Sequence, residues 1–496
     1  MERFFMFTLK KITVLFVIIL VYLPVSLDAT ILHVAVPTLN RSLNLTSNQL
    51  LWVIDIYALL MAGLLLPMGS LGDRIGYKKL MLVGVLIFGL ASLAAARAQS
   101  AQMLIASRAL LALGASMILP ATLACLRDVF TESAERNRAI GVWAFVGGGG
   151  AALGPLVGGY ILNHYDWTLV FLINIPIVLL SIPLIVYLLR RQETNNRQSI
   201  NLLQALVFIS AIIAIVFGLK HVFAALTFFN LAVLLIGLLV MYGFIRFSLR
   251  SEHPLIDFSL FGNSMVSTST VVVVFSMVAV VGFELLMAQE LQFTHGYSPL
   301  QAGLFMFPFI LSFGLSSFLV VMLLNRLGFK LTACIGLVVG GAALLSLALI
   351  DVTAAYVTST LLMILLGVGL EMAFLSATST ILAAAPKDKA AAVGAIEGMA
   401  YELGTGLGVT LFGILLSLFY VGNLRERLGE MAPTEFGSSL GETIQVAAQL
   451  SPDNRETVLN IASEAFLSAH STVLIIASLI LFLLAALSWR LIPARS

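Results

Sequence analysis

The sequence predicts an all-α, polytopic membrane protein with fourteen transmembrane helices. Of its 496 residues, 60% are hydrophobic and only 10% are charged, and the mean hydropathy is +1.05. A soluble globular protein carries far more charge than this. Apolar stretches of about 17 to 25 residues, the length that a helix needs to cross a bilayer, also recur along the whole chain.

Fourteen stretches have this length. They cover residues 12–35, 49–69, 80–97, 102–125, 139–162, 168–189, 201–219, 226–245, 263–288, 301–323, 331–350, 354–383, 393–420 and 470–489. An even number of spans places both termini on one side. Twenty Lys and Arg residues fall on that side and six, including Lys220, on the other. Because Lys and Arg are enriched in cytoplasmic loops, we expect both termini to be cytoplasmic.

A short motif occurs twice and divides the chain. The sequence GSLGDRIGYKK follows the second span, and LLNRLGFK follows the tenth, with Gly76 and Gly328 at the same position 252 residues apart. Such a repeat is typical of transporters built from two similar halves. We therefore expect six-helix bundles at 1–190 and 263–496 with an inserted helix pair at 191–262. The last loop, at about 421–469, is either a helical hairpin or a mobile linker.

Ionisable side chains inside the spans are the candidate functional residues. Each costs roughly 2.5 to 3.5 kcal/mol at the centre of a membrane helix on insertion scales, so each needs a partner or a task. The predicted spans contain Asp28, Asp55, Arg108, Glu284, Glu371, Glu397 and Glu402.

Asp28, about midway along the first span, is the leading candidate for a proton site. A carboxyl group takes up or releases a proton when its burial and its distance to a cation change, and Arg108 is the candidate cation. Arg108 is alternatively a structural residue that donates to backbone carbonyls. Glu397 is a second candidate for proton coupling, because it lies deep in a glycine-rich span.

The remaining acids are candidates for the counter-charge of a cationic substrate. They are Asp55, Glu284, Glu371 and Glu402, together with Glu397. Carboxylates among Met and aromatic side chains suit bulky organic cations. For Asp55 a solvated group near the outer end of the second span is an equal alternative, and Glu284 and Glu371 are alternatively partners of neighbouring helices.

Residues 139–161 contain a glycine pattern that is unusual for a helix. Gly150, Gly154, Pro155, Gly158 and Gly159 follow the spacing GxxxGPxxGG. Small residues let a neighbouring helix approach closely in a membrane, which is one interpretation. The spacing also resembles the antiporter motif in the fifth helix of exporters of the major facilitator superfamily.

Other segments resemble the same superfamily. GSLGDRIGYKK is similar to its loop motif, which implies a cytoplasmic latch formed by Asp73, Arg74 and Gly76; a simple anchor of positive charge is the alternative. SLDATILHVAVP is similar to its first-helix pattern LDxTxxNxAxP, with His33 in place of Asn.

Over its whole length the chain resembles the fourteen-helix drug:proton antiporters of this superfamily, the branch that exports quaternary ammonium compounds and methyl viologen. The resemblance implies a monomer in a bacterial inner membrane that exports lipophilic cations in exchange for protons, with the proton gradient as energy source and no cofactor. A metabolite transporter on the same fold is one alternative, and a membrane sensor or enzyme is another. No nucleotide-binding motif, metal-ligand spacing or cluster of basic residues points to an enzyme or to nucleic-acid binding.

Overall fold

The computed structural model describes residues 9–189, 202–224, 226–251, 254–384, 390–428 and 437–492, and this part of the chain contains helices and no strands. The helices are α1 (Leu9–Leu43), α2 (Ser47–Ile75), α3 (Tyr77–Ala96), α4 (Ala101–Val129), α5 (Ser133–His164), α6 (Leu169–Leu172), α7 (Asn174–Leu188), α8 (Leu202–Ala224), α9 (Phe228–Ser248), α10 (Ser264–Gln289), α11 (Pro299–Leu315), α12 (Ser317–Ala348), α13 (Tyr356–Ala384), α14 (Ala390–Leu428), α15 (Leu440–Ala447) and α16 (Pro452–Leu491). A one-turn 3-10 helix, η1 (Phe258–Gly262), precedes α10, and a π-helical turn, η2 (Glu290–Thr294), follows it. Thirteen described helical segments are long and apolar enough to span a membrane, and α11 is a shorter apolar helix.

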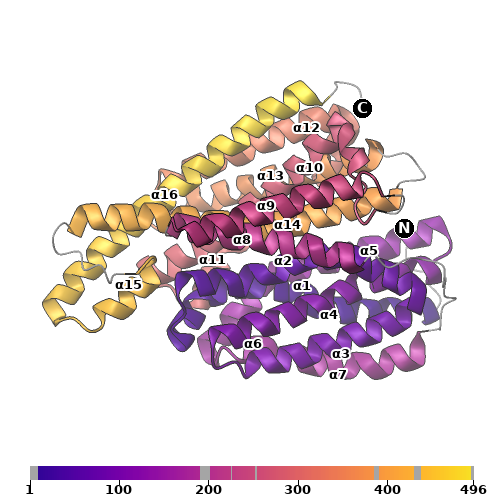
Figure 1. The fold of residues 1–496 in the computed structure, drawn as a ribbon, viewed down its shortest axis with the longest axis horizontal. Helices are drawn as coiled ribbons and strands as arrows, with labels where there is room; N and C mark the ends of the chain where they lie inside the picture. Colours follow the sequence, from indigo (N-terminus) through magenta and orange to yellow (C-terminus); the bar gives the residue numbers. More distant parts are fainter. Residues whose placement is uncertain are drawn as a thin grey trace.

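The long helices run side by side and alternate in direction (Figure 1). The start of α1 and the end of α16 lie at the same end of the bundle, which we call the terminal end. The opposite end, where α15 lies, is called the α15 end. The predicted even number of crossings is consistent with this arrangement, while the loop cations at Arg190, Arg191 and Lys387 lie outside the described residues.

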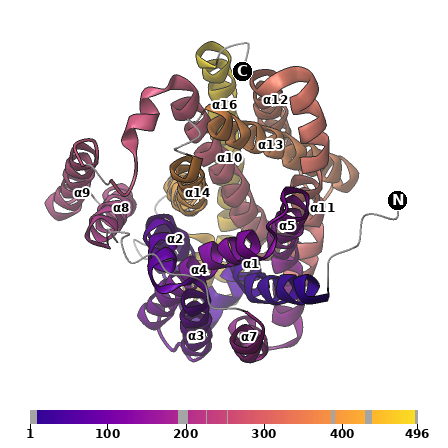
Figure 2. The same ribbon diagram turned by 90° about the vertical axis from the view of Figure 1, so that its right-hand side faces the viewer.

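The helices form two groups, which Figure 1 shows one above the other. Helices α1 to α7 form the first half, and α10 to α14 with α16 form the second half. The halves meet where α2 packs on α14, α5 on α11 and α1 on α10. Helices α8 and α9 pack on each other, and α8 packs on both α2 and α14 at one side of the bundle (Figure 2). The expected boundary after residue 190 lies outside the described residues.

The repeated motif has the same backbone conformation in both halves. Gly76 has a φ of 90° and Gly328 has a φ of 76°, a region that glycine adopts without steric cost. In the first half this residue separates α2 from α3. In the second half the helix is broken in the same way at Gly328, inside α12. The tenth predicted span therefore comprises α11 and the first part of α12.

Most of the described part of the last loop is helical. Helix α14 continues to Leu428 and α16 begins at Pro452, so both spans extend beyond their predicted ends. Between them lies α15, whose Gln445 side chain donates to Asn40 of α1 over 2.9 Å. Residues 429–436 lie outside the described part of the chain. Of the two expectations, the helical hairpin fits the described residues.

Candidate functional site

Asp28 and Arg108 form an ion pair at the centre of the first half. Arg108 Nη1 donates to Asp28 Oδ2, and only 2% and 1% of the two side chains are exposed. Arg108 Nε also donates to the backbone carbonyl of Val53 in α2 over 3.2 Å, and its guanidinium lies 4.5 Å from the centre of the Tyr57 ring. The structure thus shows both contacts that were considered for Arg108, the one with the acid and the one with a backbone carbonyl. Its role in proton coupling stays a prediction. The residue faces the acid and also holds a backbone carbonyl, so it joins α1, α2 and α4.

Glu284 pairs with a residue that the sequence analysis did not connect to it. Its Oε2 atom lies 2.7 Å from Nδ1 of His33, and both side chains are buried. His33 belongs to α1 and Glu284 to α10, so this contact joins the two halves. Of the two expectations for Glu284, the structure shows a partner on a neighbouring helix. The two residues are 251 positions apart in the chain, which is why no local pattern revealed the pair.

Asp55 is not a solvated group near the membrane surface, and that alternative is wrong. Its side chain is fully buried and accepts from Lys220 Nζ over 2.7 Å and from Thr410 Oγ1 over 2.7 Å. Lys220 also lies over the ring of Trp52, at 4.3 Å from its centre. Lys220, which the sequence analysis counted among the cations outside the spans, is therefore a buried partner within α8, and Trp52 contacts it. The pair joins α2, α8 and α14.

Glu402 is the acid without a partner. It is half-buried, and in the described part of the chain it forms no hydrogen bond or ion pair. Electrostatic interactions with Glu402 affect three tyrosines, Tyr22 of α1, Tyr57 of α2 and Tyr401 beside it in α14. Tyr22 stacks on Trp143 of α5, with 4.5 Å between the ring centres. This acid is thus within electrostatic range of tyrosines from both halves.

The other two acids have hydroxyl partners within the second half. Glu397 of α14 accepts from Thr378 of α13 over 3.3 Å. Glu371 of α13 accepts from Ser317 of α12 over 2.6 Å. Neither acid faces a cation among the described residues, so neither charge is neutralised by a salt bridge. Both remain available as counter-charges or as proton sites, and no contact chooses between those roles.

The glycine pattern of α5 is a contact surface with two faces. A Cβ atom at Gly150 would lie 1.9 Å from Ser26 Oγ, one at Gly154 would lie 2.0 Å from Thr30 Oγ1, and one at Gly158 would lie 2.7 Å from Ile31. These three glycines therefore permit the close packing of α1. Gly159 faces the second half, where its Cβ would lie 2.7 Å from the Pro299 carbonyl at the start of α11.

Pro155 lies in the middle of this surface, and α5 continues through it. Because proline has no backbone N–H, the carbonyl of Ala151 four residues earlier loses its helical donor. Thr30 Oγ1 donates to that carbonyl over 2.7 Å. The first-helix segment around Asp28 and the glycine pattern of α5 are thus joined by one hydrogen bond.

The loop motif between α2 and α3 holds its neighbour through Lys78. Lys78 Nζ donates to the carbonyls of Val186 and Leu189 at the end of α7, over 2.7 Å and 2.6 Å. Asp73 accepts from the hydroxyl of Tyr77, and Arg74 is exposed. The loop motif therefore does contact a neighbouring helix, but through Lys78 and not through Asp73 or Arg74. A cation near a helix C-terminus is stabilised by the free carbonyls and the helix dipole.

A second buried acid near the α15 end escaped the sequence analysis. Oε2 of Glu290 in η2 lies 2.5 Å from Nδ1 of His470 in α16, and Oε1 of Glu290 lies 3.3 Å from Nε2 of His295. The hydrogen bond to Glu290 raises the pKa of His295. In the sequence Glu290 follows the predicted span 263–288 by two residues, so it was taken as part of a loop. All three residues belong to the second half.

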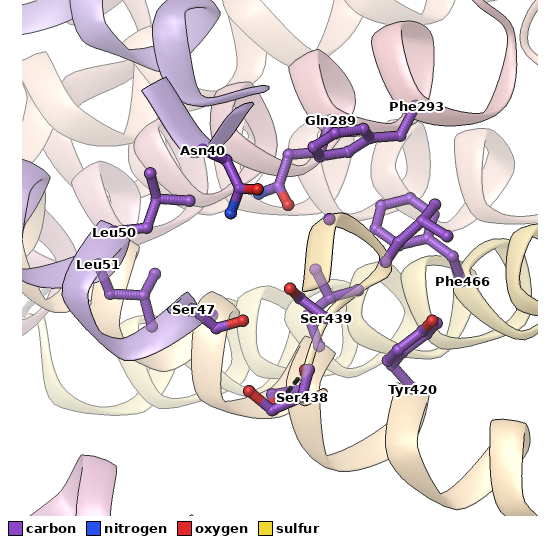
Figure 3. Close-up of a pocket in the computed structure, with 15 residues that line it drawn as sticks. Asn40, Ser47, Leu50, Leu51, Gln289, Phe293, Tyr420, Ser438, Ser439 and Phe466 are labelled. Atoms are coloured by element: carbon purple, nitrogen blue, oxygen red, sulfur yellow. Dashed lines mark hydrogen bonds between the residues drawn. The ribbon is translucent and has the colours of Figure 1, made fainter. Parts of the chain in front are cut away.

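One small pocket lies at the α15 end, between α1, α2, α10, α14 and α15 (Figure 3). Asn40, Gln289 and Ser439 surround it, with Phe293 and Phe466 on one side. None of the predicted site residues lines it. Among the described residues no group of three or more His, Cys, Asp or Glu side chains could hold a metal ion.

The structure is built like a secondary transporter. It is a helical membrane bundle with two halves, a repeated loop motif and buried charges. Residues 18–409 match the Major Facilitator Superfamily. The chain belongs to this family. It is therefore a transporter and not an enzyme.

Two curated relatives are similar over almost their whole length. The methyl viologen resistance protein SmvA of Salmonella typhimurium is 47% identical over 96% of this chain and 97% of its own. The multidrug efflux pump LfrA of Mycolicibacterium smegmatis is 31% identical over 95% and 94%. Among solved structures, a bacterial homolog of the human lysosomal transporter Spinster, inward-facing and unoccupied, aligns with a TM-score of 0.70 over 98% of both chains at 16% identity. This last similarity shows the fold alone.

Proposed function

We propose that this chain is a proton-coupled antiporter that exports lipophilic organic cations, including quaternary ammonium compounds, dyes and methyl viologen, across a bacterial inner membrane. The proposal includes fourteen spans, a division into two bundles at 1–190 and 263–496 with an inserted pair at 191–262, and cytoplasmic termini, which place the α15 end outside. The printed names of the two relatives, one for methyl viologen resistance and one for multidrug efflux, support a drug as the substrate.

The observation that carries the proposal is Glu402, an acid without a partner in the described part of the chain that lies within electrostatic range of Tyr22, Tyr57 and Tyr401. An organic cation needs a counter-charge and π faces, and it needs few directed hydrogen bonds. A carboxylate that already had a cationic partner would have to lose it when a substrate binds. Glu402 has no such partner in the described part of the chain, so it is the best placed acid to neutralise the ligand.

Asp28 and Arg108 are the proposed proton-coupling pair. While the guanidinium donates to the carboxylate, the negative charge of Asp28 is stabilised and proton binding is disfavoured. Separation of α1 from α4, or rotation of either helix, would remove that stabilisation and favour uptake of a proton. The Thr30 bond to Ala151 ties the same stretch of α1 to α5, so movement of α5 against α11 is transmitted to Asp28.

Three contacts join the two halves, or the second half's α15, to the first half toward the α15 end. Gly159 contacts the start of α11, Gln292 of η2 donates to the Val34 carbonyl over 3.0 Å, and Glu442 of α15 accepts from the Ser47 amide of α2. With the α15 end outside, this structure is closed toward the outside. Export requires these contacts to open in each cycle, as alternating access does in transporters built from two halves.

The test uses everted membrane vesicles with an imposed proton gradient. We expect the wild type to accumulate a dye cation and methyl viologen when the interior is acid. Glu402→Gln should bind such cations more weakly in equilibrium binding, whereas Asp28→Asn should bind them but lose gradient-driven accumulation. Glu464→Gln is the control, an exposed acid of the same half that pairs with Arg427.

The alternative of a proton-coupled metabolite transporter makes a different prediction. It requires that vesicles accumulate no lipophilic cation with either sign of gradient. Unchanged cation binding by Glu402→Gln would remove Glu402 from the substrate site without deciding the direction of transport. Accumulation by Asp28→Asn at the wild-type rate would show that protons are coupled elsewhere.

A further inference from the structure

Among the residues that the structure describes, His33 and Glu284 are the buried ion pair that crosses from one half to the other. The two side chains are 2% and 4% exposed, and 2.7 Å separates His33 Nδ1 from Glu284 Oε2. An ionised carboxylate can only accept, so Nδ1 carries the hydrogen. The second ring nitrogen, Nε2, is buried and has no hydrogen-bond partner. This nitrogen can hold or lack a proton without any other bond being broken.

The other charged residues on the helices around His33 and Glu284 either form ion pairs of their own or lie several residues away along the chain. On α1 the nearest is Asp28, five residues earlier, which is held by Arg108 of α4. Tyr401 of α14 interacts electrostatically with both Glu284 and Glu402, and Tyr57 of α2 with Asp28, Arg108 and Glu402. Beyond Glu284 along the chain, Glu290 is held by two histidines. None of these contacts supplies a second cation to Glu284, so a charge on His33 is the one that would balance it.

We propose that His33 is a proton-binding site whose occupancy closes the α15 end of the transporter. When a proton is bound at Nε2, the imidazolium and the Glu284 carboxylate form an ion pair between α1 and α10. When the proton has left, the same hydrogen bond joins a neutral ring to the carboxylate, and the Coulomb attraction between two opposite charges is lost. The proton is neither created nor passed to a cofactor; it enters from water at the open α15 end and leaves after closure.

This role deepens the proposed function, on which it rests for the direction of transport. In an exporter driven by protons, the outward-open form should bind a proton and then close toward the outside. A pair that is strengthened by a proton and lies across that closure produces this order of events. The first-helix pattern that this segment resembles has Asn at position 33, which cannot be charged, so this device belongs to the present chain and not to the pattern.

The experiment measures closure directly and does not depend on transport. Spin labels are placed at Gln99, between α3 and α4, and at Leu349, after α12, which are exposed positions at the α15 end of opposite halves. Pulsed electron paramagnetic resonance of the full-length chain in lipid nanodiscs then gives the distances between labels from about pH 6 to about pH 8.5, the range in which histidine is the usual side chain to change charge.

We expect the wild type to favour the short distance at low pH. One proton changes the ratio of closed to open molecules by at most about tenfold per pH unit, and the short distance should give way to a longer one as the pH rises. His33→Asn keeps a side chain that can donate to Glu284 but cannot be charged, so its distances should change with pH much less than those of the wild type, and only through the Asp28–Arg108 pair. Glu284→Gln removes the other charge and should have the same effect.

His470→Asn is the matched control, because His470 also pairs with a buried glutamate at this end but lies in the same half as its partner. It should keep the pH dependence of the wild type. A wild type with no pH dependence, a His33→Asn chain with the wild-type response, or a His470→Asn chain that loses it would each overturn the proposal. If His33→Asn does not fold, Glu284→Gln and the wild-type titration still decide. Failure of cation accumulation in vesicles with this pH response intact would contradict the direction or substrate of transport and not the proton site.

Discussion

Replacing Gly159 by alanine should open the α15 end without unfolding the protein. The added Cβ would lie 2.7 Å from the Pro299 carbonyl oxygen, 2.8 Å from Leu300 Cα and 3.0 Å from the Leu300 amide nitrogen. All three are backbone atoms at the start of α11, so no side chain can rotate away. The clash exists only while α5 and α11 are in contact, because the methyl group would face open space once the halves separate.

The size of the effect follows from this geometry. Forcing an extra carbon into a packed contact costs typically about 1 to 3 kcal/mol. If the cost falls on the closed form alone, the ratio of open to closed molecules rises by about 5-fold to about 150-fold. Gly303→Ala should act in the same direction, since its Cβ would lie 2.7 Å from the Pro155 carbonyl of α5.

The assay is the distance between labels at Gln99 and Leu349, with thermal stability of the purified protein measured in parallel. Gly149→Ala is the control on the same helix, because no atom lies within 4 Å of its added Cβ. A Gly159→Ala chain with the wild-type distance distribution would refute the reasoning. So would a shift of equal size in Gly149→Ala, which would make the effect one of helix propensity and not of contact.

Three further predictions concern buried and loop charges. Lys220→Met should destabilise the protein by about 3 to 5 kcal/mol because it leaves Asp55 buried without its cation, and the double variant with Asp55→Asn should recover most of this in a thermal unfolding comparison. Glu397→Gln should impair efflux of divalent cations more than of monovalent ones. Export of a dication against one proton moves charge against a potential worth about 2.3 kcal/mol per 100 mV, so it favours a second proton, for which Glu397 is the candidate site. Equal loss for both kinds of cation in voltage-clamped vesicles would contradict this prediction. Lys78→Gln should slow efflux with little change in cation affinity, because Lys78 holds α7 at the terminal end, and Asp73→Asn should have the smaller effect of the two.

Much of the fold was predictable because a bilayer imposes a length on each helix. Spans of apolar residues and the repeated loop motif are local features, and the positive φ of Gly76 and Gly328 follows from their matching positions. The boundaries were less predictable. Helices α14 and α16 extend beyond the apolar stretch on which the count relied, because contacts with α15 and with each other stabilise turns that hydropathy alone assigns to a loop.

The candidate site was predicted as a list of residues but not as a set of pairs. Asp28 and Arg108 stood out because charge is rare inside an apolar span, and their pairing was an expectation from that rarity. Lys220 did not stand out, since it lies where an apolar stretch ends and positive residues are ordinary there. His33 was visible only as a departure from a pattern. Pairing across 165 or 251 residues depends on how the helices pack, and no local periodicity records it.

The inserted helices make the two sides of the transporter unequal toward the lipid. Helix α8 packs on α2 and α14 together, so the seam between the halves on that side is shielded by α8 and α9 (Figure 2). On the other side α5 and α11 form the seam themselves. A cation dissolved in the lipid therefore meets a protein wall at one seam and a pair of glycine-lined helices at the other. The seam that faces the lipid without inserted helices is thus the one that the Gly159 contact closes.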